Sequence, residues 1–502
     1  MPPVLAATFS LLLTAVLLWW DRRRRADLTA ATWIPTLWLF FMGSRSVTQW
    51  IYLGTPIEEL TANLLDGSPL ERTVFSGLIL CSLIVLFSRR VAWGSVLTRN
   101  GWFLLFIVYC LISVAWADYP FVSFKRWIKA IGDPLIVLVL LTERNPAGAM
   151  VAVLRRCAFF LIPMSVVFIK YYPELGHTYD SWTGVASYTG VTTNKNLLGY
   201  LLFVFGLLFV CTWTERQRIQ DQSHRRVETG ICALLLFLIA YLFYLANSQT
   251  AFVAFAVSAM IAMAVRRATI RRHIGAIAVC LIAATWVVMA TNLSGFVLAA
   301  LGRDATLTGR TDLWEAVLPM AVHPLFGAGF ESFWLGPRLA SLWAQFAFRP
   351  TQAHNGYIEM YLNLGIVGLT LFMIFLVASF GSVRRALHEA YAAPDTVDVN
   401  RIIVARFGVG YVIAMVAYNV TEATFKPSNF LFILLLLLVV RYHMAPAVET
   451  NRAAVAPRWR RPDESTALPQ LPLRKRWVAE RRPAVPWSGL RGRAPFTKPT
   501  SR

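Results

Sequence analysis

The hydrophobic residues of this chain fall into long uninterrupted blocks that are separated by short polar segments. Each block spans about 15 to 20 residues, close to the length that a helix needs to cross a lipid bilayer. The runs are continuous and do not alternate residue by residue, which argues against a transmembrane strand barrel. The pattern predicts thirteen membrane-spanning helices, over residues 4–20, 28–43, 73–88, 102–117, 128–142, 152–169, 197–213, 230–246, 250–265, 274–291, 361–380, 402–419 and 429–441.

Composition agrees with a membrane protein. Of the 502 residues, 57% are hydrophobic and 15% are charged, whereas a soluble domain of this size would need far more charge to cover its surface. The first block ends in arginines without a small-residue cleavage site, so we expect a retained span and no cleaved signal peptide. The six cysteines lie in or beside apolar blocks, so we expect small buried side chains and no zinc or haem site.

The arginines of the short loops predict the orientation in the membrane. Such residues accumulate on the cytoplasmic side of membrane proteins. If residues 22–25 are cytoplasmic, the N-terminus lies outside and every later basic cluster falls inside. Those clusters are Arg89/Arg90, Arg144 with Arg155/Arg156, Arg216/Arg218/Arg225/Arg226, Arg266/Arg267/Arg271/Arg272 and Arg384/Arg385.

The spans divide the chain into four parts. We expect ten transmembrane helices in 1–291, a large periplasmic loop in 292–360, three more helices in 361–441, and a disordered basic cytoplasmic tail in 442–502. From residue 441 onward there are fourteen Lys or Arg against four Asp or Glu, with many prolines and no apolar periodicity. Such a tail is expected to lie near anionic membrane lipids, and no nucleic-acid partner is expected.

Basic residues on the outer side are informative because the orientation rule gives no reason for them. Several lie at the ends of spans, where a long cation reaches the phosphate-rich headgroup zone. Cations that converge there from different loops would suit a lipid-attached pyrophosphate; the alternative for each is ordinary extension to lipid headgroups. The outer cations are Lys125, Arg126, Lys170, Lys195, Arg303, Arg310, Arg338, Arg349 and Lys426.

Arg310 lies in the large outer loop, at a predicted helix start. Asp312 and Glu315 have the spacing of a capping box, so a helix is expected to begin at residue 312 or 313. Free amide hydrogens at a helix N-terminus favour an anion, and an arginine there suits phosphate contact. The alternative for Arg310 is a salt bridge to Asp304 or Glu331.

A histidine occurs near the end of the same loop. His354 precedes the span that begins near 361, and a histidine can accept a proton from a sugar hydroxyl near neutral pH. Asn355 and Glu359 could orient His354 or bind sugar hydroxyls; capping and solvation are their alternatives. The turn-rich residues 323–330 are expected to pack the loop against the membrane helices.

Three segments together resemble the O-antigen ligase and Wzy-type polymerase superfamily. They are Asn194-Lys195-Asn196 at the start of a span, Gly309-Arg310-Thr311-Asp312 in the long loop, and His354-Asn355 before the last spans. With residues 304–310, the pattern is most similar to the ExoQ-like exopolysaccharide polymerases. The resemblance covers roughly residues 70–440.

The resemblance implies a GT-C-like, all-α polytopic enzyme with about 12–13 transmembrane helices and a largely helical periplasmic loop. It implies a glycosyltransferase without a metal or other cofactor, acting on undecaprenyl-pyrophosphate-linked oligosaccharides at the periplasmic face of the inner membrane. Arg310 and Lys195 match its pyrophosphate-binding cations, and His354 matches the histidine that activates or positions the acceptor hydroxyl. Arg126, with Lys125 beside it, matches a family arginine more loosely.

The sequence leaves two questions open: which acceptor the protein uses, and whether it is an enzyme or a transporter. A polymerase would use another lipid-linked repeat unit and a ligase would use lipid A-core; the ExoQ-like segments favour the polymerase. A transporter or flippase would place ionisable residues in the middle of spans and show repeat symmetry. The spans hold few such residues, and Asn247-Ser248-Gln249 is expected to be a short outer turn.

Overall fold

The computed structural model describes residues 1–25, 27–54, 68–179, 186–290, 310–392 and 397–442. Within these ranges the regular structure is helical apart from one small antiparallel hairpin, β1 (His177–Tyr179) with β2 (Ala186–Tyr188). The helices are α1 (Pro3–Arg24), α2 (Trp33–Gly43), α3 (Val47–Ile51), α5 (Pro69–Ser88), α6 (Trp93–Arg99), α7 (Gly101–Ile112), α8 (Pro120–Leu141), α9 (Pro146–Tyr171), α10 (Pro173–Gly176), α11 (Lys195–Glu215), α12 (Gln222–Ala246), α13 (Gln249–Ala264), α14 (Ala268–Ala290), α16 (Arg310–Val317), α17 (Gly336–Gln345), α18 (Gly356–Ala392), α19 (Val399–Tyr418) and α20 (Phe430–Val439).

The predicted spans all fall on helices, and the fold is an all-α polytopic membrane protein, as expected. Among the described residues, eight helices are long and apolar enough to cross a membrane, or nine if the bent pair α6 and α7 is one span. The second, ninth and thirteenth predicted spans fall on shorter apolar helices, and α8 has the length but carries several charges. The number of thirteen spans therefore stays a prediction.

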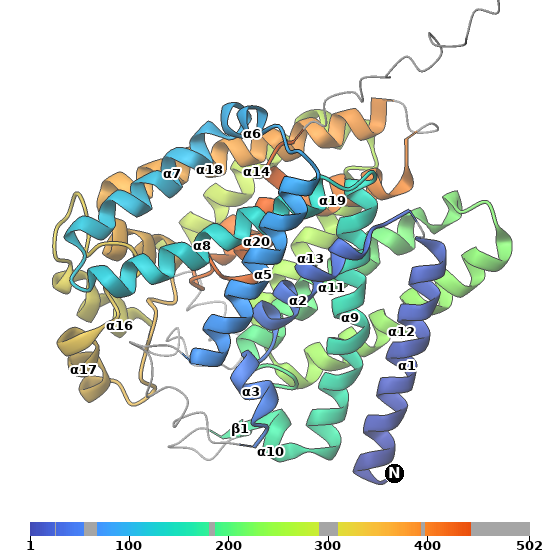
Figure 1. Cartoon of the computed structure of the whole chain (residues 1–502), viewed down its shortest axis with the longest axis horizontal. Coiled ribbons are helices and arrows are strands. Elements are labelled where there is room, and N and C mark those ends of the chain that lie inside the picture. The colour runs from blue at the N-terminus through green and yellow to red at the C-terminus, as the bar shows by residue number, and fades with distance from the viewer. Residues whose placement is uncertain (26, 55–67, 180–185, 291–309, 393–396, 443–502) are drawn as a thin grey trace, which may run out of the picture. The chain divides into compact units, whose positions relative to one another are not determined.

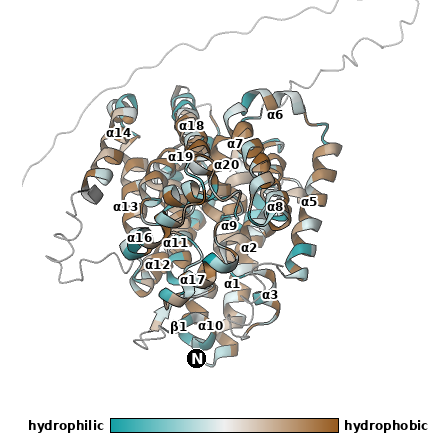
Figure 2. Ribbon diagram, turned by 90° about the vertical axis from the view of Figure 1, so that its left-hand side faces the viewer, coloured by the Kyte–Doolittle hydropathy of each residue, from teal (hydrophilic) through white to brown (hydrophobic). Residues whose placement is uncertain are grey.

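The central helices are packed on all sides, whereas the peripheral ones have one face open to lipid. In α9, 89% of the most hydrophobic stretch is buried, but only 17% in α5 and 11% in α14. Hydrophobic residues occur on the peripheral helices as well as inside (Figure 2). Two cysteines, Cys81 of α5 and Cys280 of α14, lie on these exposed faces, so the expectation of buried cysteines is correct for the other four only.

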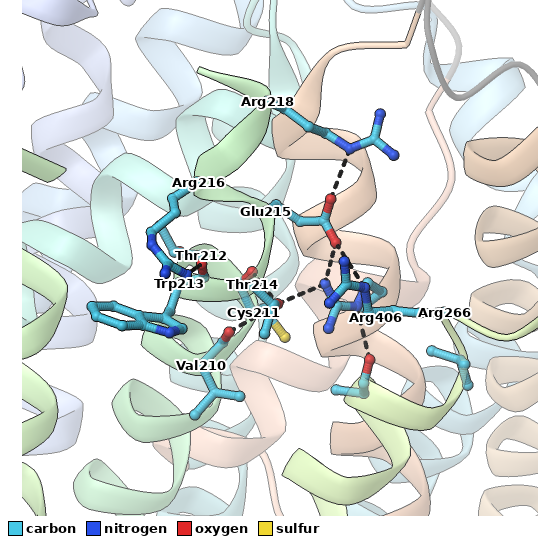
Figure 3. A network of polar contacts seen from close by, with 12 residues as sticks. Val210, Cys211, Thr212, Trp213, Thr214, Glu215, Arg216, Arg218, Arg266 and Arg406 are labelled. Carbon is cyan, nitrogen blue, oxygen red and sulfur yellow. Dashed lines mark hydrogen bonds and ion pairs between the residues drawn. The ribbon is translucent and has the colours of Figure 1, made fainter. Parts of the chain in front are cut away.

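An ion-pair network joins three helices at the arginine-rich end (Figure 3). Arg406 of α19 is completely buried; its guanidinium donates to Glu215 and Thr214 at the end of α11, and its Nε donates to the Ala262 carbonyl of α13 at 2.8 Å. Arg218 also donates to Glu215, at 2.8 Å. A buried arginine is tolerated here because its charge meets a carboxylate and its Nε and Nη1 donate to acceptors, although its Nη2 has no hydrogen-bond partner within the described residues.

A second network involves the basic cluster at the start of the predicted span 152–169. Arg155 and Arg156 are both buried inside α9. The Arg155 guanidinium contacts Asp21 of α1 at 3.2 Å and pairs with Glu228 of α12. Arg155 therefore ties α9 to two other helices, and the membrane side of this cluster stays a prediction.

The outer loop segment 323–335 folds back over the helix ends, as expected. Phe330 N donates to Ser113 Oγ at the end of α7 (3.1 Å), and Ile366 N of α18 donates to the Pro324 carbonyl (2.9 Å). The close approach requires Gly365, whose φ is 67° and whose added Cβ would lie 2.2 Å from the Leu325 carbonyl oxygen. This packing fixes the start of α18, where the candidate site lies. In Figure 1, α16 and α17 are seen together at this end of the bundle.

Candidate functional site

A buried carboxylate, Glu422, lies at the centre of the candidate site. It follows α19, and its side chain is only 2% exposed. Its Oε1 accepts from Arg310 Nη2 at 2.7 Å and from Asn196 Nδ2 at 3.0 Å. Its Oε2 accepts from Tyr200 Oη at 3.3 Å and lies 3.6 Å from His354 Nδ1. One carboxylate thus gathers four side chains from three segments that are far apart in the sequence.

Arg310 is the first described residue of α16, which corrects the predicted helix start. The capping-box spacing predicts a start at 312 or 313, but the helix already includes Arg310 and Thr311. The partner of Arg310 is Glu422, not Glu331; Asp304 lies outside the described residues. A guanidinium has five N–H donors, and the bond from Nη2 to Glu422 leaves others for a ligand. The Arg310 side chain is 14% exposed, so it is also accessible.

His354 is held at the entrance of α18 by contacts on either side. Its φ is 48°, in the left-handed region, which histidine enters more readily than most residues. The preceding Ala353 carbonyl accepts from Trp314 Nε1 of α16 at 2.7 Å. The Nδ1 of His354 is buried and makes no hydrogen bond within the described residues, although it lies 3.6 Å from Glu422 Oε2. The side chain is 24% exposed, so the ring is accessible while Nδ1 faces the carboxylate.

The turn after α19 fixes Glu422 relative to His354. Asn419 Oδ1 accepts from the amides of Thr424 and Phe425 at 2.8 and 3.0 Å, which folds the turn on itself. The Asn419 carbonyl accepts from Gly356 N at 2.8 Å. An added Cβ on Gly356 would lie 2.4 Å from Asn419 Oδ1, so the two segments are in direct backbone contact.

The predicted site residues Asn355 and Glu359 have structural partners. Asn355 Oδ1 caps α18 by accepting from Tyr357 N and Ile358 N, and its Nδ2 donates to the Val420 carbonyl at 3.0 Å. Glu359 is 3% exposed and accepts from Trp334 Nε1 and the Ala353 amide, at 2.9 and 2.8 Å. These contacts support capping and loop anchoring over the predicted sugar binding.

Lys195 lies next to the site in the sequence. It is the first residue of α11, which is capped by Asn194, and the following Asn196 contacts Glu422. The Lys195 side chain is exposed and has no hydrogen bond or ion pair within the described residues. It is therefore a free cation one residue from the Glu422 cluster.

Arg126 and Lys125 make contacts that do not include Glu422. Both lie in α8, and not in a loop as the predicted span limits implied. Arg126 donates to the backbone carbonyl of Glu331, and the Lys125 ammonium lies 4.9 Å from the Phe121 ring centroid. The structure thus brings Arg310 and His354 together on Glu422, with Lys195 adjacent, while no contact links Arg126 or Lys125 to that carboxylate.

Sequence reasoning missed Glu422, Asn196 and Tyr200. Glu422 is the one carboxylate of the short predicted outer loop 420–428, and this single acidic residue, between Thr421 and Thr424, was the available signal. Within the described residues no group of three or more His, Cys, Asp or Glu side chains is arranged to hold a metal ion.

Comparison with known proteins relates part of the chain to a family. Residues 232–373 match the family described as O-antigen ligase, and the match includes Arg310 and His354. The matched part of this polytopic membrane protein is therefore similar to O-antigen ligases, which agrees with the resemblance that the sequence motifs indicated.

A curated relative gives a second point of reference. The chain is 25% identical over 307 residues to the exopolysaccharide production protein ExoQ of Rhizobium meliloti (strain 1021). The aligned part covers 57% of this chain and 66% of that relative, slightly less than two thirds of its length.

Proposed function

We propose that the chain is an inner-membrane glycosyltransferase that uses undecaprenyl-pyrophosphate-linked glycans at the periplasmic face. In this proposal it joins repeat units of an exopolysaccharide or O-antigen without a metal ion. The observation that carries the proposal is the meeting of Arg310 and His354 on Glu422, with Lys195 adjacent. That combination supplies a phosphate-binding cation and a proton acceptor in one place. The site also lies at the end of the bundle opposite the arginine clusters, which supports the periplasmic assignment.

The proposed reaction is a single displacement at the anomeric carbon. The acceptor hydroxyl forms the new C–O bond while the bond between the anomeric carbon and the pyrophosphate oxygen breaks. The hydroxyl proton passes to the imidazole of His354, whose ring Nδ1 faces Glu422. The configuration at the sugar carbon is inverted, and undecaprenyl pyrophosphate leaves with the bonding electron pair.

The cations act on the leaving group. Negative charge grows on the pyrophosphate as the glycosidic bond breaks, and fixed cations in a partly dry site stabilise it strongly. Arg310 can keep its bond to Glu422 and direct its remaining N–H groups to phosphate oxygens. Lys195 adds a second charge from the start of α11. Glu422 is a positioning residue, since it holds both the arginine and the histidine.

Two acceptors fit this chemistry. The similarity to an exopolysaccharide production protein favours a second lipid-linked repeat unit, and therefore a polymerase. The description of the matching family favours lipid A-core as acceptor, and therefore a ligase. Disrupting the gene separates them: loss of long polymer indicates a polymerase, whereas polymer that is made but missing from lipopolysaccharide indicates a ligase.

The enzymatic test uses the purified full chain in lipid nanodiscs with an undecaprenyl-pyrophosphate oligosaccharide, and measures product length on gels. Replacing Arg310 by Gln or His354 by Ala is expected to reduce turnover by about 10²–10³-fold, the usual effect of removing a charge-stabilising or acid–base group.

Matched controls lie in the same outer loop. Arg349 and His323 are exposed there and make no contact with Glu422. Arg349→Gln and His323→Ala are therefore expected to retain turnover. Equal activity of Arg310→Gln, His354→Ala and the wild type would overturn the proposed site.

A further inference from the structure

A cavity lies at the opposite end of the bundle from Glu422. Its volume is about 290 Å³, and it is bounded by the α6–α7 junction, the distal part of α18 and the end of α20. Helix α18 begins at the candidate site at Gly356, is kinked at Gly365, and continues past Arg385, which lines this cavity. The cavity and the candidate site therefore lie near different ends of α18.

The cavity is built by a specific clamp between distant parts of the chain. Asn100, at the break between α6 and α7, accepts from Arg441 N at 2.9 Å and donates to the Arg441 carbonyl at 3.0 Å. The Arg441 guanidinium donates to Ser382 Oγ of α18 at 2.7 Å. These bonds fix Arg441, two residues after the end of α20, against the α6–α7 junction and α18, and they hold the cavity walls in place.

The charged side chains that line the cavity are all arginines. Arg99, Arg385 and Arg441 come from three different elements, and no Asp or Glu is among the described residues of the wall. Arg99 and Arg385 make no hydrogen bond or ion pair within the described part of the chain. This contrasts with the buried arginines of α9 and α19, which meet carboxylates. Three cations without a carboxylate favour an anionic ligand.

Apolar surface continues from the cavity towards the middle of the membrane. Trp102 lines the cavity at the start of α7 and is 49% exposed. Leu105 and Ile112 lie on the same face of α7 and are 45% and 54% exposed. Helix α6 bends away from α7 by 91°, which suits a segment at the membrane–water boundary. A ligand with an anionic head and long apolar chains matches both surfaces.

We propose that this cavity binds a phosphate group, and that the group is the phosphodiester of an anionic phospholipid whose chains lie along the exposed face of α7. Arg99, Arg385 and Arg441 hold the phosphate, and Ser379 and Ser382 line the same wall. Basic pockets between membrane helices recognise lipid headgroups in this way. The site is independent of the proposed transfer reaction.

The test titrates the full detergent-solubilised chain with phosphatidylglycerol or phosphatidylcholine and measures bound lipid by native mass spectrometry. The wild type is expected to bind phosphatidylglycerol preferentially. The variant Arg99→Gln/Arg385→Gln/Arg441→Gln is expected to bind it about a hundredfold more weakly. The double variant Arg99→Gln/Arg385→Gln leaves the Arg441 clamp intact and should show most of this loss.

The matched control removes the same charge from arginines at the same end of the bundle. Arg90, Arg267 and Arg272 are exposed and do not line the cavity. Arg90→Gln/Arg267→Gln/Arg272→Gln is expected to keep the wild-type affinity. If this control variant binds phosphatidylglycerol as weakly as the triple variant of the cavity, the proposed site is overturned. Such a result would indicate that the lipid is attracted by the overall positive charge of this end and not by the cavity. Competition by millimolar inorganic phosphate to the same extent as by lipid would overturn the assignment to a phospholipid.

Discussion

The two ends of the helical bundle both place arginines against carboxylates, but the balance of charge differs. At the arginine-rich end, Arg155 contacts both Asp21 and Glu228, and Arg406 is satisfied by Glu215, Thr214 and a backbone carbonyl. At the end that carries the candidate site, the carboxylate of Glu422 is shared by Arg310 and His354 together with two neutral donors.

This difference separates a structural network from a candidate binding site. Arg155 and Arg406 are buried and their charges are balanced by carboxylates, so they are not accessible to a ligand and hold helices together. Arg310 is partly exposed and keeps unused donors, and the exposed Lys195 lies beside the cluster. The surplus positive charge is what a pyrophosphate would neutralise. Four substitutions test the contrast, in order of decreasing expected effect.

Glu215→Gln is expected to cause the largest change, and the change is in stability. It leaves Arg406, which is fully buried, without its carboxylate. Removing one partner of a buried pair costs about 3–5 kcal/mol, because the other charge stays buried. Thermal unfolding, followed by tryptophan fluorescence, measures the loss.

A double substitution provides the control for that stability effect. Glu215→Gln with Arg406→Met removes both charges and should recover part of the lost stability. A single variant as stable as the wild type, or a double variant less stable than the single one, would contradict the structural role of this network.

Glu422→Gln should instead act mainly on catalysis. The amide keeps the size of the side chain but no longer balances Arg310 or orients His354 by charge. We expect kcat to fall by about a hundredfold, while KM for the lipid-linked donor falls, because the unpaired Arg310 binds pyrophosphate more tightly. Steady-state kinetics in nanodiscs measures both constants. A parallel rise in KM and fall in kcat would indicate a merely structural role.

The sequence predicted the helices and two members of this cluster, but not the residue that joins them. The hydrophobic blocks predict the helices directly, because the pattern within one segment is enough to predict that segment's helix. Arg310 and His354 were found because they lie in motifs with a family resemblance. Glu422 lies 112 residues from Arg310, and only tertiary packing brings them together.

The same reason explains why the partners of Arg155 could not be predicted. The sequence places Arg155 within the span 152–169, but its partners, Asp21 and Glu228, belong to α1 and α12, which sequence spacing does not connect to α9. The predicted start of α16 at residue 312 or 313 is wrong because the helix already includes Arg310, two residues before Asp312.

Gly356→Ala should have an intermediate effect at the outer end. The added Cβ would lie 2.4 Å from Asn419 Oδ1, so the turn that carries Glu422 must move away from His354. Overpacking of this kind costs about 1–3 kcal/mol, and turnover per folded molecule should fall as well. The control is Gly77→Ala in α5, where an added Cβ meets nothing within 4 Å. If both variants melt and turn over like the wild type, the backbone contact does not position the site.

Lys195→Gln should have the smallest effect. The side chain is exposed and makes no ion pair within the described residues, so its loss costs little stability. An exposed charge near phosphate contributes about 1 kcal/mol, which corresponds to a rise of roughly fivefold in KM for the donor. The rise should shrink at high salt, because exposed charges are screened. Lys170→Gln removes another outer lysine, which lies over the Tyr241 ring, and should leave KM unchanged. If Lys195→Gln and the wild type have the same KM at low salt, Lys195 does not contact the pyrophosphate. Arg310 would then be the cation of this cluster that binds it.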